Sequence, residues 1–196
     1  MSADHLSRMV TDLTDAGLLE TGHLSVTLER LDVAELLRDA VQRVPMASTR
    51  THVSTPLGCR VFIRGDAQRI EQVVTNLLTN AVKYGEPGTS IDVGLTWTDW
   101  NAEITVANQG QGIPPDEIVL VFERYVRSRS IEPQKRKGLG LGLYICKGIV
   151  EAHGGRIWAD SVPGVITTFH VRIPLDGPPV PVDSTPEPEP IAAATR

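Results

Sequence analysis

Residues 66–84 read DAQRIEQVVTNLLTNAVKY, and this stretch decides the fold of the chain. Its apolar residues recur at i, i+3 and i+4 spacing, which predicts a helix over 67–83. These residues are Ile70, Val73, Val74, Leu77, Leu78, Ala81 and Val82. Asp66 is suited to cap the helix, because an aspartate side chain accepts hydrogen bonds from the first free N–H groups. The stretch therefore predicts a helix that buries one face.

Asn76, Asn80 and Lys83 form a polar edge beside that apolar face, because they stand at i, i+4 and i+7. Alone, such an edge is equally typical of a solvated flank. Asn80, however, lies next to Val73 and Leu77 around the helix, where an unpaired amide would be costly. Neutral oxygens also suit Mg²⁺, which keeps several of its waters. A metal and phosphate site is therefore the functional hypothesis for this edge.

The remaining periodicity predicts strands and helices on both sides of this helix. We expect helices over 33–44, 141–152 and, opened by Pro114 and Pro115, up to Leu120. A short amphipathic helix before Gly22, broken by Gly17, has no partner within its own segment and must pack on the rest of the chain or on another chain. Strands are expected over 25–33, 60–63, 91–97, 102–107, 156–159 and 167–173.

This order of elements predicts an α+β fold, a two-layer α/β sandwich with a mixed, mostly antiparallel sheet and helices on one face. The main domain of the chain is expected over 25–175. Residues 1–24 precede it as a separate helix, and the proline-rich residues 176–196 are expected to be disordered.

Two glycine clusters accompany the polar edge. The sequence NQGQGI at 108–113 follows a strand, where glycines let the backbone approach a flat ligand closely. The sequence KGLGLGL at 137–143 precedes a helix, whose N–H groups and positive end can face phosphate. Between them, residues 122–138 are basic and lack periodicity, which is typical of a functional loop. Each cluster alone is weak evidence for a nucleotide site, but the polar edge and the two glycine clusters in this order are far more specific together.

Together these segments resemble the catalytic domain of bacterial histidine kinases over about residues 32–175. The sequence EQVVTNLLTNAVKY at 71–84 resembles the family's N box, 108–113 its G1 box, VFERY at 121–125 its F box and 137–142 its G2 box. The family pattern continues through 143–158 and ends with TTF at 167–169. The resemblance implies the Bergerat ATP-binding fold of the gyrase, Hsp90, histidine kinase and MutL superfamily.

The resemblance also implies roles for individual residues. Asn80 would ligate Mg²⁺, Asn76 would assist at the metal and phosphates, and Arg127 would contact phosphate, so Asn76 and Arg127 are the expected catalytic residues. Lys83 and Tyr84 would contact phosphate and ribose or base. The other expected nucleotide-binding residues are Asn108, Gly110, Gly112, Ile113, Gly138, Leu139, Gly140, Leu141, Gly142 and Thr168.

Asn108 departs from the family pattern, which usually has an aspartate there to accept the adenine amino proton. The asparagine carbonyl oxygen still accepts, but it lacks a charge and its amide adds a donor. We expect ATP binding to be weakened by about 1 to 2 kcal/mol rather than abolished.

The N-terminal segment 6–22 resembles the second helix of the kinases' dimerisation hairpin. None of His5, His23, His52, His153 and His170 matches the family's phosphoacceptor box. The expected partners are therefore a histidine-bearing hairpin, from the same parent chain or from a split kinase, and a response regulator. The N-terminal helix is also a candidate for homodimer formation.

Composition narrows the choice of function. A net charge of -5 argues against nucleic-acid binding, because such proteins concentrate lysine and arginine. The two cysteines, Cys59 and Cys146, lack zinc-site spacing and suit a reducing compartment. No run approaches the length of a membrane span. We expect a cytoplasmic module, although a longer parent protein could be membrane-anchored.

Three functions are consistent with these patterns. The first is a Mg-ATP-dependent histidine kinase module that phosphorylates a histidine on a separate hairpin. The second is a regulatory module that binds ATP without transferring phosphate, which Asn108 favours. The third is a related ATPase or anti-sigma-factor kinase, which fits less well because the ATPases have a glutamate base where this chain has Asn76.

Overall fold

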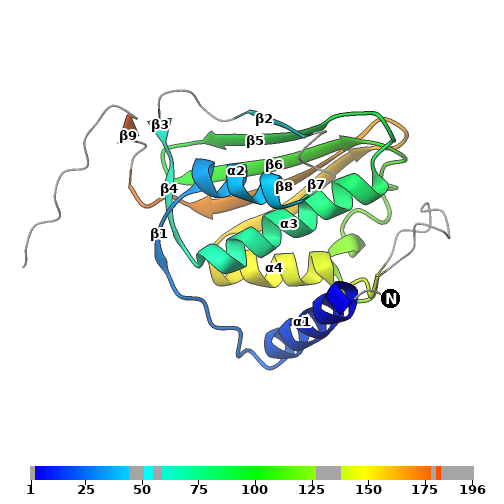
Figure 1. The fold of residues 1–196 in the computed structure, drawn as a ribbon, viewed down its shortest axis with the longest axis horizontal. Helices are drawn as coiled ribbons and strands as arrows, with labels where there is room; N and C mark the ends of the chain where they lie inside the picture. Colours follow the sequence, from blue (N-terminus) through cyan, green and yellow to red (C-terminus); the bar gives the residue numbers. More distant parts are fainter. Residues whose placement is uncertain (1–2, 45–50, 55–58, 127–137, 178–179, 182–196) are drawn as a thin grey trace, which may run out of the picture.

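The main sheet has five strands in the order β2-β5-β6-β8-β7 (Figure 1). The computed structural model describes residues 3–44, 51–54, 59–126, 138–177 and 180–181. The strands are β2 Thr51–Ser54, β5 Ile91–Trp97, β6 Asn101–Gln109, β7 Arg156–Val162 and β8 Ile166–Pro174. β2 runs parallel to β5, and the other neighbours are antiparallel. The prediction of a mixed, mostly antiparallel sheet is therefore confirmed.

Three helices cover one face of this sheet: α2 Val33–Arg43, α3 Ala67–Tyr84 and α4 Gly142–Ala152 (Figure 1). The apolar stripe of α3 is buried as its periodicity predicts, with Leu77 and Leu78 fully enclosed. On the sheet, alternate residues such as Val106 and Phe169 face the same core. The two-layer prediction is therefore confirmed, and the opposite face of the sheet carries polar side chains.

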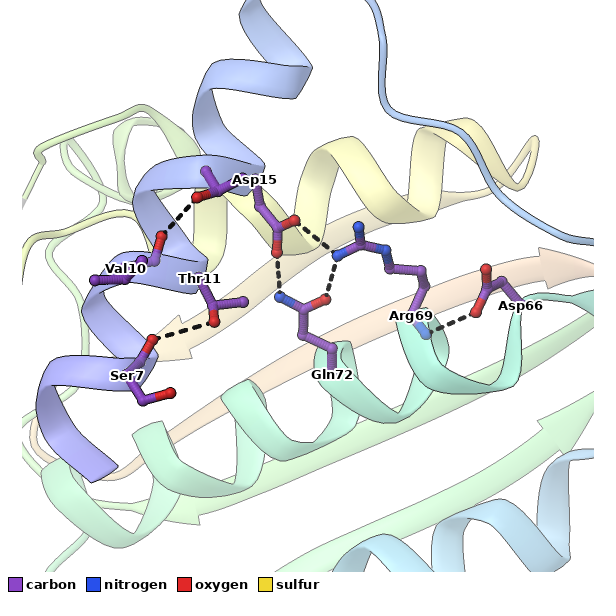
Figure 2. Close-up of polar contacts among 8 residues, drawn as sticks. Ser7, Val10, Thr11, Asp15, Asp66, Arg69 and Gln72 are labelled. Carbon is purple, nitrogen blue, oxygen red and sulfur yellow. Dashed lines mark hydrogen bonds and ion pairs between the residues drawn. The ribbon is translucent and has the colours of Figure 1, made fainter. Parts of the chain in front are cut away.

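Helix α1 (Ala3–Glu20) lies outside this layer and packs against α4. Figure 2 shows Asp15 pointing from α1 toward α3, where its carboxylate accepts hydrogen bonds from Arg69 Nη1 at 2.8 Å and Gln72 Nε2 at 2.7 Å. Asp15 is only 3% exposed, so this pairing offsets the cost of burying its charge. The predicted apolar stripe of α1 packs on the rest of the chain only in part, since Ala16 is buried whereas Val10 and Leu13 are each 58% exposed.

Gly17 does not break α1, contrary to the sequence prediction. Glycine weakens a helix by only about 1 kcal/mol relative to alanine, and the contacts of α1 with the body of the protein outweigh that cost. One of these contacts places Leu19 against Gly148 of α4, where a Cβ would lie 2.2 Å from Leu19 Cδ2. None of the helices in the described parts of the chain is long and apolar enough to cross a membrane.

Several strand predictions differ from the structure at their ends. The strand expected over 25–33 is shorter, β1 Glu29–Asp32, because the Thr27 N–H donates to the Asp66 side chain instead of to a strand. The strand expected over 60–63 is two pieces, β3 Cys59–Arg60 and β4 Phe62–Gly65, of which β4 pairs with β1.

Other segments were missed or wrongly assigned. β2 was not predicted, and it is too short to show a clear alternation. The helix expected after Pro114 is wrong, since residues 115–119 are turns and only the 3₁₀-helix η1 Leu120–Phe122 follows. Within the tail expected to be disordered, β9 Val180–Pro181 pairs with β3. Asp176 is also described, and its N–H donates to the Phe62 carbonyl at 2.8 Å. Residues 178–179 and 182–196 of that tail lie outside the described part of the chain.

Asp66 caps α3 and also holds the segment that leads from α1 to the sheet. Its carboxylate accepts hydrogen bonds from the N–H groups of Arg69 and Thr27, both at 3.1 Å. Its own N–H donates to Nε2 of His153, at the end of α4, at 2.9 Å. Burial raises the pKa of Asp66. The hydrogen bonds from the N–H groups of Thr27 and Arg69 lower it, and their combined effect is larger, so the pKa lies below the ordinary value of 3.8.

We expect Asp66→Ala to lower the free energy of unfolding at pH 7 by about 1 to 2 kcal/mol, because both N–H groups lose their acceptor. Because the folded pKa is depressed, the charge of Asp66 stabilises the fold above the ordinary value of 3.8, and this contribution disappears as the pH falls through the folded pKa. Urea denaturation of the wild type and of Asp66→Asn, which keeps a capping oxygen, measures the charge contribution. A difference between these two proteins that grows as the pH falls below 3.8 would contradict the assignment.

Candidate functional site

The fold brings three of the predicted segments together: the polar edge of α3, the loop after β6 and the glycine segment before α4. The end of α3 meets the loop after β6 through a β-bridge between Gly85 and Gly110. The Glu86 N–H also donates to the Gln109 carbonyl at 2.8 Å. At the other end of the site, α3 packs against α4.

Asn76 lies against the first residue of α4. A Cβ added to Gly142 would stand 3.8 Å from Cγ and Nδ2 of Asn76, an ordinary van der Waals distance, so the two residues are direct neighbours. The Asn76 Nδ2 atom is buried and lies near the Cys146 thiol, a weak acceptor, but it makes no hydrogen bond of normal geometry to the described residues. The first residues of α4 likewise have no side-chain cap there, since Leu141 stands at the N-cap position. The buried Asn76 amide thus lies beside a helix start that has no side-chain cap.

Asn80, Lys83 and Tyr84 continue the same edge toward the end of α3, and all three are partly buried. Lys83 Nζ donates to the Tyr84 hydroxyl at 2.8 Å and lies 4.6 Å from the centroid of the Tyr84 ring. This contact holds a cation and an aromatic ring side by side at the C-terminal turn. The edge can therefore offer an amide, an ammonium group and a flat apolar surface to one ligand.

Asn108 is the buried polar residue at the end of β6, with 6% of its surface exposed. Its Nδ2 donates to the Gln109 carbonyl at 3.2 Å. Its paired residue on the neighbouring strand β8 is Thr167, which is also 6% exposed. Thr168 was the predicted residue, but it pairs with Ala107 and therefore faces the other side of the sheet. The structure brings Thr167, rather than Thr168, to the face of Asn108.

Hydrogen bonds hold the loop 109–113 against the adjoining ends of β7 and β8. The Ile113 N–H donates to Ser161 Oγ at 2.9 Å, and Ser161 Oγ in turn lies 2.9 Å from Thr167 Oγ1. Gly112 has a φ of 74°, and a Cβ there would stand 2.7 Å from Pro163 Cα, so another residue would be both strained and blocked. Ser161 and Thr167 were not predicted; the alternation of β8 around buried Phe169 would have identified Thr167.

The glycine segment before α4 is described from Gly138 onward. Gly138 and Gly140 both have positive φ, 107° and 73°, and Leu139 is 37% exposed. The side chain of Leu141 is buried in the core, so only its backbone could serve a ligand. Arg127 lies outside the described residues, as does most of the predicted loop.

Cys146 on α4 lies near Asn76, but its chemistry is passive. Burial raises the pKa of the Cys146 thiol to about 12, and the neighbouring Asn76 amide opposes this only in part. The thiol therefore stays neutral and contacts the Val73 carbonyl, with Sγ at 3.9 Å from the oxygen. A nucleophilic cysteine is therefore excluded at this position.

Comparison with known proteins gives consistent results. The model of the family described as histidine kinase-, DNA gyrase B- and HSP90-like ATPase matches residues 65–177. The probable sensor histidine kinase TcrY of Mycobacterium tuberculosis is 37% identical over 177 residues, 89% of this chain. The mycobacterial sensor histidine kinase MprB has a solved structure with a TM-score of 0.69 and 32% identity, covering 76% of this chain and all of that chain.

Full-length ShkA in complex with AMPPNP has a TM-score of 0.75 and 25% identity, covering 91% of this chain and 38% of that one. The curated relatives are longer than this chain. The chain spans 36% of the length of TcrY and 33% of the length of the MprB of Mycobacterium sp. strain KMS.

Proposed function

Because the chain belongs to the family of histidine kinase-, DNA gyrase B- and HSP90-like ATPases, we propose that it is the ATP-binding catalytic module of a two-component sensor histidine kinase. It transfers the γ-phosphoryl group of ATP to a histidine on a separate dimerisation hairpin. Residues 25–175 form the catalytic domain, and 1–24 derive from the second helix of such a hairpin. A response regulator acts downstream, in the cytoplasm.

The observation that carries this proposal is the buried Asn76 Nδ2 atom, which makes no hydrogen bond of normal geometry in the described part of the chain. A buried amide donor without an acceptor costs about 1 to 3 kcal/mol, so a native structure keeps one where a ligand satisfies it. Gly142 and the start of α4 lie beside it and add backbone N–H groups. This donor-rich corner suits a ligand with many acceptor oxygens and negative charge, such as a polyphosphate.

The other end of the site suits adenine. Since the Asn108 Nδ2 donates to the Gln109 carbonyl, the carboxamide oxygen of Asn108 can accept a hydrogen bond from an exocyclic amino group. Asn108 is buried, which strengthens such a hydrogen bond. This geometry supports binding of ATP despite the absence of the family's usual aspartate.

The chemistry is phosphoryl transfer by positioning and charge neutralisation. The bond between the γ-phosphorus and the bridging β-oxygen breaks, and a bond from an imidazole nitrogen to that phosphorus forms. Asn80, assisted by Asn76, would hold Mg²⁺ through amide oxygens, and the ion would neutralise charge on the phosphates. Lys83 and Arg127 supply positive charge from the protein, while Asn76 and the start of α4 orient the phosphates.

We expect Asn80→Ala to remove most of the Mg²⁺ dependence of ATP binding while leaving the fold intact. No hydrogen bond ties the Asn80 side chain to another described residue, so its loss leaves no buried group unpaired. Calorimetric titration with ATP, with and without Mg²⁺, measures the effect; we expect ATP affinity in Mg²⁺ to fall about tenfold or more.

Thr79→Ala is the matched control for that experiment, because the Thr79 hydroxyl bonds only its own helix, at Thr75 O. It should keep the Mg²⁺ dependence of the wild type. An Asn80→Ala protein that still binds ATP more tightly in Mg²⁺, to the same degree as Thr79→Ala, would refute the metal assignment.

A second candidate function is an ATP-responsive interaction module that does not transfer phosphate, and it is favoured by the neutral Asn108. The two functions separate in one measurement. The kinase labels an added hairpin from γ-labelled ATP, whereas the regulatory module binds ATP and labels nothing.

A further inference from the structure

Tyr125 has an unusual backbone. Its φ of 63° is the only positive value at a residue other than glycine in the described ranges. Such a conformation is unfavourable for a residue that carries a side chain, and it persists only where the surroundings require it. Burial of the ring does not explain it, because Tyr125 is 59% exposed.

The strained turn makes a backbone contact with the glycine segment before α4. The Tyr125 N–H donates to the Gly140 carbonyl at 2.9 Å. Gly140 itself has a φ of 73°, and a Cβ there would stand 3.0 Å from the Val126 oxygen and 3.1 Å from Tyr125 Cα. The two backbones therefore touch, and each adopts a conformation that the contact requires. We call this contact between Tyr125 and Gly140 the backbone clasp.

The clasp is fastened to the core on the side of Tyr125. Phe122, three residues earlier, is buried and packs edge-to-face on Phe169 of β8, with ring centroids 6.3 Å apart. Glu123 forms an ion pair with Lys147 of α4 at 3.3 Å. The turn thus has a fixed position relative to both the sheet and α4. Gly140, held by that turn, stands two residues before the start of α4.

We propose that the backbone clasp is a positioning device, in which the left-handed backbone of Tyr125 holds Gly140 so that the N–H groups at the start of α4 face the phosphates of the nucleotide. This role rests on the proposed function, because it concerns the same phosphate corner. Tyr125 acts through its backbone rather than its ring, so it is a positioning residue and not a catalytic one. Its side chain can change freely if the new residue tolerates a positive φ.

The test uses three substitutions that all remove the phenol ring. Glycine and asparagine tolerate a positive φ, whereas the β-branched valine does not. We expect Tyr125→Gly and Tyr125→Asn to bind Mg-ATP within about twofold of the wild type. Tyr125→Val should bind it about tenfold more weakly, because it must open the clasp to relax. Titration calorimetry of the full chain measures the four affinities.

Adenosine provides a second measurement that separates positioning from general damage. It lacks phosphates and reports only on the Asn108 end of the site, so all three variants should bind it as the wild type does. Equal ATP affinities for Tyr125→Val and Tyr125→Gly would overturn the proposal. Parallel losses of ATP and adenosine in Tyr125→Val would also overturn it, since they would indicate a structural role. Failure of the wild type to bind ATP would instead refute the proposed function, together with any role of the clasp in it.

Gly140→Ala tests the opposite side of the clasp. Its matched control is Gly22→Ala, because Gly22 has a similar φ of 68°, but a Cβ added there would have nothing within 4 Å. Both variants carry the strain of alanine at positive φ, but only Gly140→Ala also presses on Tyr125. We expect weaker ATP binding in Gly140→Ala alone; equal binding by the two variants would count against the clasp.

Discussion

Incubated alone with γ-labelled ATP, the purified chain should bind nucleotide but acquire no acid-labile phosphate on histidine. Transfer requires a nucleophile held in line with the γ-phosphorus at about 3 to 3.5 Å. Because none of the five histidines matches a phosphoacceptor box, we expect the acceptor histidine to come from another segment. We expect no histidine label on the chain alone and clear label once an acceptor hairpin is added. This is the largest effect that we predict.

His153, at the end of α4, has both ring nitrogens occupied by the fold. It is buried, and its Nε2 accepts from the Asp66 N–H while its Nδ1 lies 2.7 Å from the Ile149 carbonyl. Phosphorylation of Nε2 would break the contact between the start of α3 and the end of α4, and phosphorylation of Nδ1 would break the contact with Ile149 within α4. His153 therefore serves the fold rather than phosphoryl transfer.

His170 lies on the wrong face of the sheet. Its ring stacks on Trp158 with centroids 4.8 Å apart, and its two nitrogens each lie 3.1 Å from a carboxylate, of Glu103 and Asp160. It pairs with Thr105, whose neighbours Ile104 and Val106 face the core. His170 thus faces away from Asn108 and the helices, and an attack on a nucleotide bound beside α3 would have to pass through the sheet.

The measurement compares the chain alone with the chain mixed with a hairpin that carries an acceptor histidine. Acid-labile label should appear on the hairpin only, and a hairpin with that histidine replaced by glutamine should remain unlabelled. Acid-labile label mapped to any of His5, His23, His52, His153 or His170 of the isolated chain would refute the donor-only assignment.

Some helices and strands could be predicted well because the residues that define them are close together in the sequence. The helix α3 combines an N-cap, an apolar stripe and no interrupting glycine or proline, so its limits could be predicted to within one residue. The hairpin of β5 and β6 likewise alternates clearly over both strands and has a polar turn closed by the Thr98 N–H and the Asn101 carbonyl. In both cases the side chains that bury the element are close in sequence.

Elements that depend on distant contacts could not be predicted in the same way. The continuity of α1 through Gly17 rests on α3 and α4, which lie far along the chain. The start of β1 is set by Asp66, whose acceptance of the Thr27 N–H no local pattern reveals. The same holds in the site, where Ser161 joins the loop after β6 through a hydroxyl 48 residues away from Ile113.

Motif matching alone cannot decide whether Thr167 or Thr168 faces the site. A motif places two adjacent threonines in the site, but only strand alternation decides which one shares a face with Asn108. Phe169 is buried against the helices, so Thr167 must face the same way. The register of β8 against β6 agrees, because it sets Thr167 directly opposite Asn108.

Gly110→Ala should abolish measurable ATP binding and lower the free energy of unfolding by about 2 to 4 kcal/mol. A Cβ at residue 110 would stand 2.6 Å from the Tyr84 carbonyl oxygen, a backbone atom that cannot rotate away. To relieve this contact, the end of α3 must separate from the loop after β6, which breaks the bridge between Gly85 and Gly110. The Tyr84 and Asn108 ends of the site would then no longer face one ligand.

Gly17→Ala is the matched control, because it adds the same methyl group in the exposed face of α1, with nothing within 4 Å of the new Cβ. There alanine should raise the free energy of unfolding by up to about 1 kcal/mol, since it favours the helix. Urea denaturation and titration with Mg-ATP measure both effects in both proteins. A Gly110→Ala protein with the stability and ATP affinity of the wild type would show that the approach of the two backbones is not required, and that the loop after β6 does not need to lie against α3 for the nucleotide to bind.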